Sequence, residues 1–138
     1  MTLLDTNVLV ALVDERDQLH ARAKRDLKTV VGPFGLTSVV LCESCFLLPQ
    51  GYLRQRLRFL LDRLGVSPVD LDPSRWGEIF DWLARYAQHE PDWCDAELVV
   101  LAGRERSSIW TYDKEFRTLW RAPDGRSLKV VPGDRKSR

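Results

Sequence analysis

The sequence predicts an α/β fold, a three-layer α/β/α sandwich around a mostly parallel central sheet. Short apolar runs typical of buried strands alternate along the chain with segments whose apolar residues recur at helical spacing. The 138 residues, 44% of them hydrophobic, suffice for one domain with a sizeable core, and no repeat or low-complexity linker interrupts them. We therefore expect a single domain over residues 1–132 and a flexible tail over residues 133–138.

The first half of the chain predicts two strands, each followed by helices. Thr6 or Asn7 can cap a helix directly after the first strand, and Ser38 can cap the helix after the second. Gly65 is well placed to end the last helix of this half, whose leucines recur on one face. The predicted elements are a strand at residues 3–4, helices at 8–13 and 20–31, a strand at 35–37, and helices at 39–48 and 52–64.

The second half continues the alternation of strands and helices. Asp72-Pro73 starts a helix on which Trp76, Ile79 and Phe80 recur at helical spacing, so we expect these three side chains to be buried. In parallel sheets of this kind, ligands bind beyond the carboxyl ends of the strands. The predicted elements are a strand at residues 66–71, helices at 74–88 and 95–105, a strand at 108–112, a short helix at 114–120 and a strand at 128–131.

Charge and hydropathy exclude some classes of protein. The net charge of +1 argues neither for nor against a polyanionic partner, but residues 67–97 are strongly acidic and residues 98–138 are basic. This distribution fits a metal site beside a phosphate-binding rim, although solvated helix faces produce the same pattern. No apolar run is long enough to cross a bilayer, and an acid stands at position five in place of a basic leader, so we expect a cytoplasmic protein without a membrane span.

The cysteines and histidines indicate no catalytic or zinc site. Cys42 and Cys45 have the spacing of half a zinc site, but no second Cys/His pair completes it, so we expect all three cysteines, Cys94 included, to be small core residues. An odd number of cysteines also agrees with a reducing compartment. His20 and His89 lie in polar helical contexts and are expected at the surface.

Four acidic residues stand where an apolar strand or helix should not carry a charge. Asp5 is the only charged residue in MTLLDTNVLVALV, and Glu43 is the only one within residues 29–53. Asp95 opens an apolar helical run, and Asp113 follows the strand-like IWTY. Because an unpaired carboxylate is costly to bury, such residues usually bind a cation or take part in chemistry.

These four acids predict a divalent metal site. Asp5 and Asp113 each follow a strand, while Glu43 and Asp95 lie early in helices, so one rim of the sheet could gather all four. Crowded carboxylates raise one another's pKa unless a cation compensates, and carboxylates with water and phosphate suit Mg²⁺ or Mn²⁺. A metal held in this way can activate water for phosphodiester hydrolysis.

At this point the sequence resembles a known family. From Thr2 to about Pro132 the chain resembles PIN-domain ribonucleases, and it is most similar to the VapC toxins of bacterial and archaeal toxin–antitoxin modules. Each motif alone is weak, but the four occur in order and at the usual spacing. The motifs are Asp5-Thr6-Asn7, Thr37-Ser38 leading to Glu43, Asp92-Trp93-Cys94-Asp95-Ala96, and Thr111-Tyr112-Asp113-Lys114-Glu115-Phe116.

The resemblance implies roles for the residues in these motifs. Asp5, Glu43, Asp95 and Asp113 would form a catalytic acidic quartet, with Asp5 and Asp95 the firmest Mg²⁺ ligands. The polar residues that match positions flanking the family's site would orient a carboxylate or a water, and these are Thr6, Asn7 and Thr111.

Several neighbouring residues compete for roles at this site. Asp92 could rival Asp95 as the ligand, but the Asp-Ala followed by an apolar run favours Asp95 and leaves Asp92 as a supporting or capping acid. Glu97 and Glu115 are expected to be solvated helix residues. The segment Arg104 to Ser108 lacks the glycine that often precedes the fourth strand in this family.

Some basic and aromatic residues are candidates for RNA contact. Arg117 and Arg121 follow Asp113 on a short helix and are the first cations to consider for phosphate binding. Trp93 and Trp120 could stack on unpaired bases, whereas Trp76, Trp82 and Trp110 are better suited to core positions.

The leading hypothesis is a Mg²⁺-dependent endoribonuclease toxin, with Mn²⁺ as a possible substitute. The resemblance implies inhibition by a cognate VapB-type antitoxin and a homodimer whose contact surface is formed by the helices of residues 39–64. One alternative is a catalytically silent PIN-type module that binds RNA or a protein. The other is a haloacid-dehalogenase-like phosphatase, but Asn7 occupies the place where that chemistry needs a second Asp.

Overall fold

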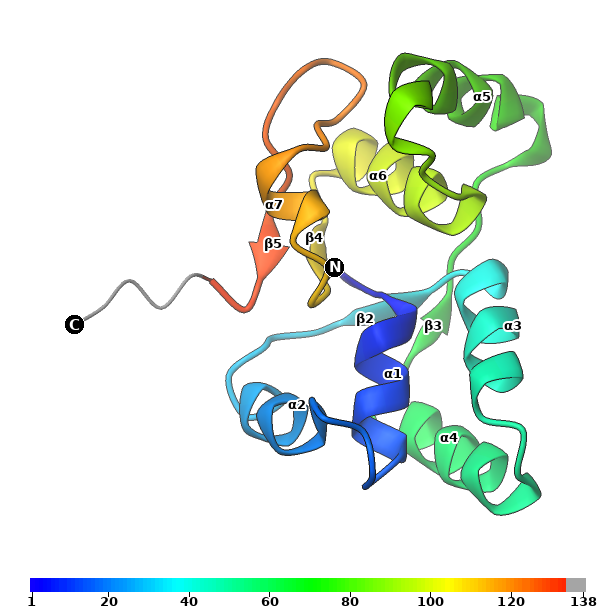
Figure 1. Cartoon of the computed structure of the whole chain (residues 1–138), viewed down its shortest axis with the longest axis vertical. Helices are drawn as coiled ribbons and strands as arrows, with labels where there is room; N and C mark the ends of the chain where they lie inside the picture. The colour runs from blue at the N-terminus through cyan, green and yellow to red at the C-terminus, as the bar shows by residue number, and fades with distance from the viewer. Residues whose placement is uncertain (134–138) are drawn as a thin grey trace.

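The computed structural model describes residues 1–133, and its centre is a parallel sheet (Figure 1). Within this range five strands pair in the order β3-β2-β1-β4-β5, and every pairing is parallel. The predicted α/β class is therefore confirmed, while the tail predicted beyond Gly133 lies outside the described residues. The strands are β1 (Thr2–Leu4), β2 (Phe34–Leu36), β3 (Ser67–Pro68), β4 (Ser108–Trp110) and β5 (Val130–Val131).

Helices cover both faces of this sheet, which gives the three expected layers (Figure 1). One layer is built from α1, which packs against α2, α3 and α4, and the other contains α5 packed on α6. The helices of the described part are α1 (Thr6–Val13), α2 (His20–Asp26), α3 (Ser38–Leu47), α4 (Gly51–Arg63), α5 (Trp76–Arg85), α6 (Trp93–Glu105) and the short α7 (Glu115–Thr118), with 3₁₀ turns at Pro73–Arg75 and Ala87–His89. Among residues 1–133, no helix is long and apolar enough to span a membrane.

The strand order determines where a ligand can bind. The chain builds β1, β2 and β3 outward in one direction and then returns to add β4 and β5 on the other side of β1. β1 and β4 are therefore neighbours at the point where the direction of winding reverses, with Leu4 opposite Trp110. In open parallel sheets, the crevice beyond the carboxyl ends of such a strand pair is the usual ligand site.

Two helix caps differ from the prediction because the chain passes from strand to helix without an intervening loop. Asp5, not Thr6 or Asn7, caps α1, and its carboxylate accepts a hydrogen bond from the backbone N–H of Thr6 at 2.8 Å. Thr37, not Ser38, caps α3, with its hydroxyl accepting from the Val40 N–H at 3.2 Å.

Some of the other predicted elements were correct in kind but too long. The strand expected at residues 66–71 is reduced to two residues, because Pro68 has no N–H to donate and β3 lies at the edge of the sheet. The helices expected at 20–31 and 74–88 end at Asp26 and Arg85.

The prediction that Trp76 and Phe80 are buried was wrong. Ile79 and Trp82 form the buried stripe of α5, which leaves Trp76 51% and Phe80 60% exposed. Both rings instead contact Trp93 edge to face, with centroid distances of 6.3 Å and 5.2 Å. Trp82 is buried as expected, and its indole N–H donates to the Arg121 carbonyl at 2.8 Å.

Three further burial predictions also need correction. Trp120 is buried against Trp82 and Phe116, so it offers no surface for RNA. Cys42 is exposed on α3 and not a core residue, whereas Cys94 is buried as expected. Glu97, expected to be solvated, is only 4% exposed.

Candidate active site

Asp5 lies at the carboxyl end of the central strand β1. Its backbone N–H donates to the Trp110 carbonyl of β4 at 3.1 Å, which extends the sheet by one residue. The residue is only 6% exposed and is therefore buried. A charged group is therefore positioned at the switch point by the strand pairing and by its own capping of α1.

Thr111 and Asn7 hold the Asp5 carboxylate in one orientation. The Thr111 hydroxyl donates to Asp5 Oδ2 at 2.7 Å, and the Asn7 amide donates to the same oxygen at 3.4 Å and to Thr111 Oγ1 at 3.3 Å. Asn7 Oδ1 in turn accepts from the Tyr112 backbone N–H at 3.2 Å. The network joins the ends of β1 and β4, so these two predicted supporting residues do contact the candidate site.

Asp113 reaches the same rim through the loop that follows β4. Its backbone N–H donates to Thr111 Oγ1 at 3.0 Å, so the hydroxyl that orients Asp5 also fixes the start of the Asp113 loop. The Asp113 carboxylate accepts from the Glu115 N–H at 3.0 Å and thereby begins α7.

Asp92 and Asp95 form a reciprocal cap at the start of α6. Asp92 Oδ1 accepts from the Asp95 N–H at 2.8 Å, and Asp95 Oδ2 accepts from the Asp92 N–H at 3.3 Å. Asp92 is the N-cap and is exposed, whereas Asp95 lies in the first turn and is partly buried. The structure therefore gives Asp92 the capping position that the sequence suggested.

Asp5 is the electrostatic centre of the four predicted acids. Burial raises the pKa of Asp5 from 3.8 to about 6, against the Thr111 and Thr6 hydrogen bonds that lower it, and the charges of Asp113 and Glu43 add to the rise. The half-buried Glu43 reaches this rim from within α3. One helix and the loop after β4 thus bring two further acids towards the Asp5 carboxylate.

The pKa of Asp95 is also raised. Burial is the main cause, followed by repulsion from Asp92 and then by the charge of Asp5. Burial likewise raises the pKa of the Cys94 thiol, and the charges of Asp5, Glu43 and Asp92 add to the rise. The region is therefore one of concentrated negative potential, which a cation would neutralise.

The four carboxylates do not form a closed metal cage. Among residues 1–133, no three His, Cys, Asp or Glu side chains are assembled closely enough to enclose an ion by themselves. Carboxylate oxygens are nevertheless the donors that Mg²⁺ and Mn²⁺ prefer, and such ions commonly use one or two carboxylates with water or phosphate oxygens completing the shell. The donor set fits a hard divalent cation in that mode.

The remaining predicted site residues, Thr6, Arg117 and Arg121, make the following contacts. The Thr6 hydroxyl is buried, and it interacts with the Cys94 thiol. The Arg117 guanidinium donates to the Pro132 carbonyl, and Arg121 Nη1 donates to Ser127 Oγ at 2.8 Å. Both arginines are exposed, and these contacts direct Arg117 towards the residue after β5 and Arg121 towards the loop before it.

Glu97 is the acid whose burial the sequence analysis misjudged. Burial raises its pKa, with a further contribution from the charge of Asp70, while contacts with the Leu71 N–H and the Thr37 hydroxyl oppose the rise. The residue ties α6 to Thr37, the N-cap of α3. Its place within the apolar run from Ala96 to Ala102 was the available indication of burial.

Comparison with known proteins assigns the fold to a family. The family model of the PIN domain matches residues 2–120. The structure is similar to Mycobacterium tuberculosis VapC20, a sarcin-ricin-loop-cleaving toxin, with a TM-score of 0.71 and 20% identity over 83% of this chain and 92% of that one. No curated protein sequence matches the chain.

Two further similar structures contain toxin–antitoxin proteins. VapBC2 from Rickettsia felis, bound to a DNA fragment from its promoter, has a TM-score of 0.63 and 15% identity over 94% of this chain and 96% of that one. A toxin–antitoxin complex from Klebsiella pneumoniae has a TM-score of 0.63 and 19% identity over 86% of this chain and 92% of that one.

Proposed function

This chain belongs to the PIN domain family, and from that premise we propose that it is a metal-dependent endoribonuclease, the toxin of a VapBC-type toxin–antitoxin module acting in the cytoplasm. The observation that carries the proposal is the position of Asp5, an acid at the switch point of the sheet whose pKa is raised chiefly by burial and further by the charges of Asp113 and Glu43. An ionised group in this position destabilises the fold unless a cation compensates it, which favours a functional role.

The proposed site would bind Mg²⁺, with Mn²⁺ as a substitute. Asp5 and Asp95 would hold the ion, and Glu43 and Asp113 would complete the site directly or through water. The chemistry that such a cation supplies to phosphodiester hydrolysis is activation of water and neutralisation of charge on the phosphate.

The supporting residues would keep the Asp5 carboxylate ready to bind. Thr111 and Asn7 both donate to Oδ2, and the Thr6 N–H donates to Oδ1, so both oxygens have fixed directions before any ligand arrives. Such outer contacts limit the reorganisation that metal binding requires. Asp92 would act on Asp95 in the same way, through the reciprocal cap.

Substitution of the two firmest ligands tests the proposal. Asp5→Asn and Asp95→Asn should abolish cleavage of RNA in Mn²⁺ or Mg²⁺ and remove the rise in melting temperature that Mn²⁺ gives the unaltered protein. Glu115→Gln, at an exposed acid on α7, is the matched control and should change neither property. RNA cleavage that persists in the Asp5→Asn, Asp95→Asn double variant would refute catalysis at this site.

The same measurements separate the alternatives. A silent binding module would leave RNA intact and show no change in melting temperature with Mn²⁺. A phosphatase of the haloacid-dehalogenase type would trap phosphate covalently on Asp5. That chemistry is disfavoured because Asn7, in place of the second acid, is engaged with Thr111 and the Tyr112 N–H.

We propose that an antitoxin binds between α1, α2 and α4. A cavity of about 670 Å³ there combines leucines with a basic rim, so an amphipathic segment that carries acids is the complementary ligand. Arg63→Glu should weaken capture of the protein encoded by the neighbouring reading frame, whereas Arg85→Glu on α5 should not. The lining residues are Leu12, Val13, Glu15, His20, Lys24, Leu27, Arg56, Phe59, Leu60, Arg63 and Leu64.

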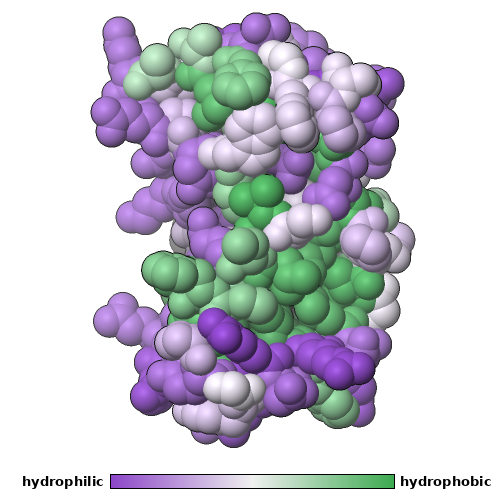
Figure 2. Space-filling model, turned by 90° about the vertical axis from the view of Figure 1, so that its right-hand side faces the viewer, coloured by the Kyte–Doolittle hydropathy of each residue, from purple (hydrophilic) through white to green (hydrophobic). Residues whose placement is uncertain are grey.

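A homodimer through α3 and α4 is supported by the apolar surface of these helices. Phe46 is 79% exposed and Leu47 50% exposed at the end of α3, close in sequence to Tyr52, which is 55% exposed. Figure 2 shows apolar residues forming a broad area on the face that carries these helices. Exposed patches of this kind mark interaction surfaces. Phe46→Glu should convert a dimer to a monomer in sedimentation analysis, and an unchanged mass would contradict this contact surface.

A further inference from the structure

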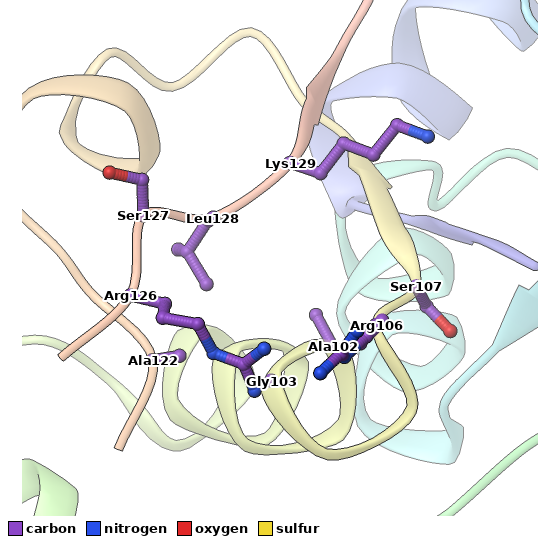
Figure 3. Close-up of a pocket in the computed structure, with 9 residues that line it drawn as sticks. All are labelled: Ala102, Gly103, Arg106, Ser107, Ala122, Arg126, Ser127, Leu128 and Lys129. Atoms are coloured by element: carbon purple, nitrogen blue, oxygen red, sulfur yellow. The ribbon is translucent and has the colours of Figure 1, made fainter. Parts of the chain in front are cut away.

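A second polar cavity lies at the amino ends of the strands, away from the acidic quartet. It has a volume of about 110 Å³ and is formed by the end of α6, the residues that lead into β4 and the loop before β5 (Figure 3). The residues that line it are Ala102, Gly103, Arg106, Ser107, Ala122, Arg126, Ser127, Leu128 and Lys129.

The charged residues that line this cavity are all basic, and one of them, Arg126, forms an ion pair with Asp124 of its own loop. Arg106, Arg126 and Lys129 line it, and no acidic residue does. Figure 3 shows the side chains of Arg106 and Arg126 reaching from opposite walls towards one another over the end of α6, while the Lys129 ammonium points away from the centre. No acidic group of residues 1–133 pairs with Arg106 or Lys129. Two guanidinium groups that face each other repel unless an anion lies between them.

The Arg126 side chain is held in this position by its own loop. Asp124 accepts from the Arg126 backbone N–H at 3.0 Å and from Arg126 Nε at 2.5 Å. The turn is closed by a bond of 2.8 Å from the Gly125 N–H to the Ala122 carbonyl, with Gly125 at a φ of +87°. Because Asp124 contacts Nε, the two terminal nitrogens of Arg126 have no partner in the described part of the chain and can bind a ligand.

Gly103 lets this loop approach α6 and so forms the floor of the cavity. A Cβ atom at Gly103 would lie 2.9 Å from the Ala122 Cβ and 3.2 Å from Pro123 Cδ. Any side chain at this position would push the loop, and Arg126 with it, away from the helix.

Arg106 occupies a backbone conformation that favours glycine. It follows α6 at a φ of +53°, and its N–H donates to the Ala102 carbonyl. The sequence therefore keeps a charged side chain at a position where glycine would be less strained. Glycine could therefore replace Arg106 without backbone strain.

We propose that this cavity binds a phosphate group, either free orthophosphate or a phosphate of a bound RNA. Two guanidinium groups offer the paired donors that match phosphate oxygens, and the volume suits a single phosphoryl group with water and not a nucleoside. Arg106 follows Asp95 by eleven residues of helix, about 16 Å along its axis. A phosphate bound here is therefore not the one proposed to be cleaved, and the inference does not depend on the nuclease activity.

The 138-residue protein is titrated with orthophosphate, and the chemical shifts of its backbone amides are recorded by NMR at each step. The amides of Gly103 and Ser107 should shift saturably. Arg106→Gly should weaken binding by about tenfold without loss of melting temperature, because glycine suits the backbone, and Arg126→Gln should weaken it similarly. Lys28→Gln, at an exposed cation with no ion-pair partner in the described residues, is the control. Absence of saturable shifts, or unchanged affinity in both arginine variants, would overturn the proposal.

A second experiment, with RNA as the competing ligand, identifies the source of the phosphate. It uses the Asp5→Asn variant, because the proposed nuclease activity of the unaltered protein would cleave the short single-stranded RNA. If the RNA displaces orthophosphate and Arg106→Gly weakens RNA binding, the cavity holds a backbone phosphate. If the RNA leaves the orthophosphate shifts unchanged, the cavity holds the free anion.

Discussion

Asp5→Asn is expected to stabilise the metal-free protein while abolishing its proposed activity. In the folded state the pKa of Asp5 is raised from 3.8 to about 6, chiefly by burial. An acid with a raised pKa binds its proton more tightly when folded. The free energy of unfolding is therefore not reduced below pH 3.8. It falls as the pH rises to about 6 and stays lower above that pH.

The size of the effect follows from this shift and from one hydrogen bond. A rise of roughly 2 in the pKa of Asp5 corresponds to about 3 kcal/mol of destabilisation at neutral pH. Asparagine removes this penalty, but its amide nitrogen cannot accept the hydrogen bond that the Thr111 hydroxyl donates to Oδ2, which costs about 1 kcal/mol. The net gain is about 1 to 2 kcal/mol, or roughly 3 to 8 °C in melting temperature for a chain of this size.

Thermal unfolding in EDTA at about pH 7.5 and about pH 4 measures both the gain and its origin. The variant should melt above the unaltered protein at the higher pH, and the gap should shrink at the lower pH because Asp5 itself becomes protonated. Excess Mn²⁺ should reduce or reverse the gap, since only the protein with the carboxylate gains from the ion. A variant that melts lower at about pH 7.5, or a gap that does not change with pH, would refute the reasoning.

Two further substitutions probe the acids around this site. Asp92→Ala should be less stable to urea than Asp92→Ser by about 1 kcal/mol, because both remove the charge but only serine keeps the cap of α6. Equal stability of the two variants would show that the cap contributes little. Glu97→Gln should raise the unfolding free energy at neutral pH, because burial raises the pKa of Glu97 and the amide carries no charge. Chemical denaturation at neutral and acidic pH would detect this increase. A lower unfolding free energy at neutral pH would contradict the prediction.

The position of the acidic rim could be predicted from the sequence because it depends on local patterns. Asp5 ends a run of apolar residues, and Asp113 follows another, so both fall at the carboxyl ends of strands whatever the packing of the helices. The parallel sheet then brings these ends together, since β1 and β4 are neighbours. The order of the strands itself did not follow from the pattern, because it depends on which helices cover which face.

The burial of individual helix residues could not be predicted in the same way. Trp76 and Ile79 both fit the apolar stripe of α5, and only the rotation of that helix against α6 decides that Ile79 is buried and Trp76 is not. Glu97 was misjudged for the converse reason. Its charge suggested solvent, but α6 is enclosed on several sides, and Glu97 is held by Thr37 and Leu71 from elements distant in sequence.

Thr111 offers the sharpest test of how the rim is held together. Its hydroxyl donates to Asp5 at 2.7 Å and accepts from the Asp113 N–H at 3.0 Å, so Thr111→Val removes both contacts at once. The cost should be about 2 to 4 kcal/mol at neutral pH, because a hydrogen bond to a buried charge is lost and a donor is left without its partner. Thr111→Ser retains the hydroxyl and should stay within about 1 kcal/mol of the unaltered protein.

The pH dependence of the Thr111→Val cost distinguishes its cause from simple loss of packing. The Thr111 hydrogen bond lowers the pKa of Asp5, so valine should raise that pKa beyond about 6. The added loss of stability should then be largest above this pH, where Asp5 would be ionised, and smaller near pH 5, where it is protonated. Urea unfolding at the two pH values measures the difference. Equal costs at both, or equal effects of valine and serine, would mean that Thr111 serves the fold and not the Asp5 carboxylate.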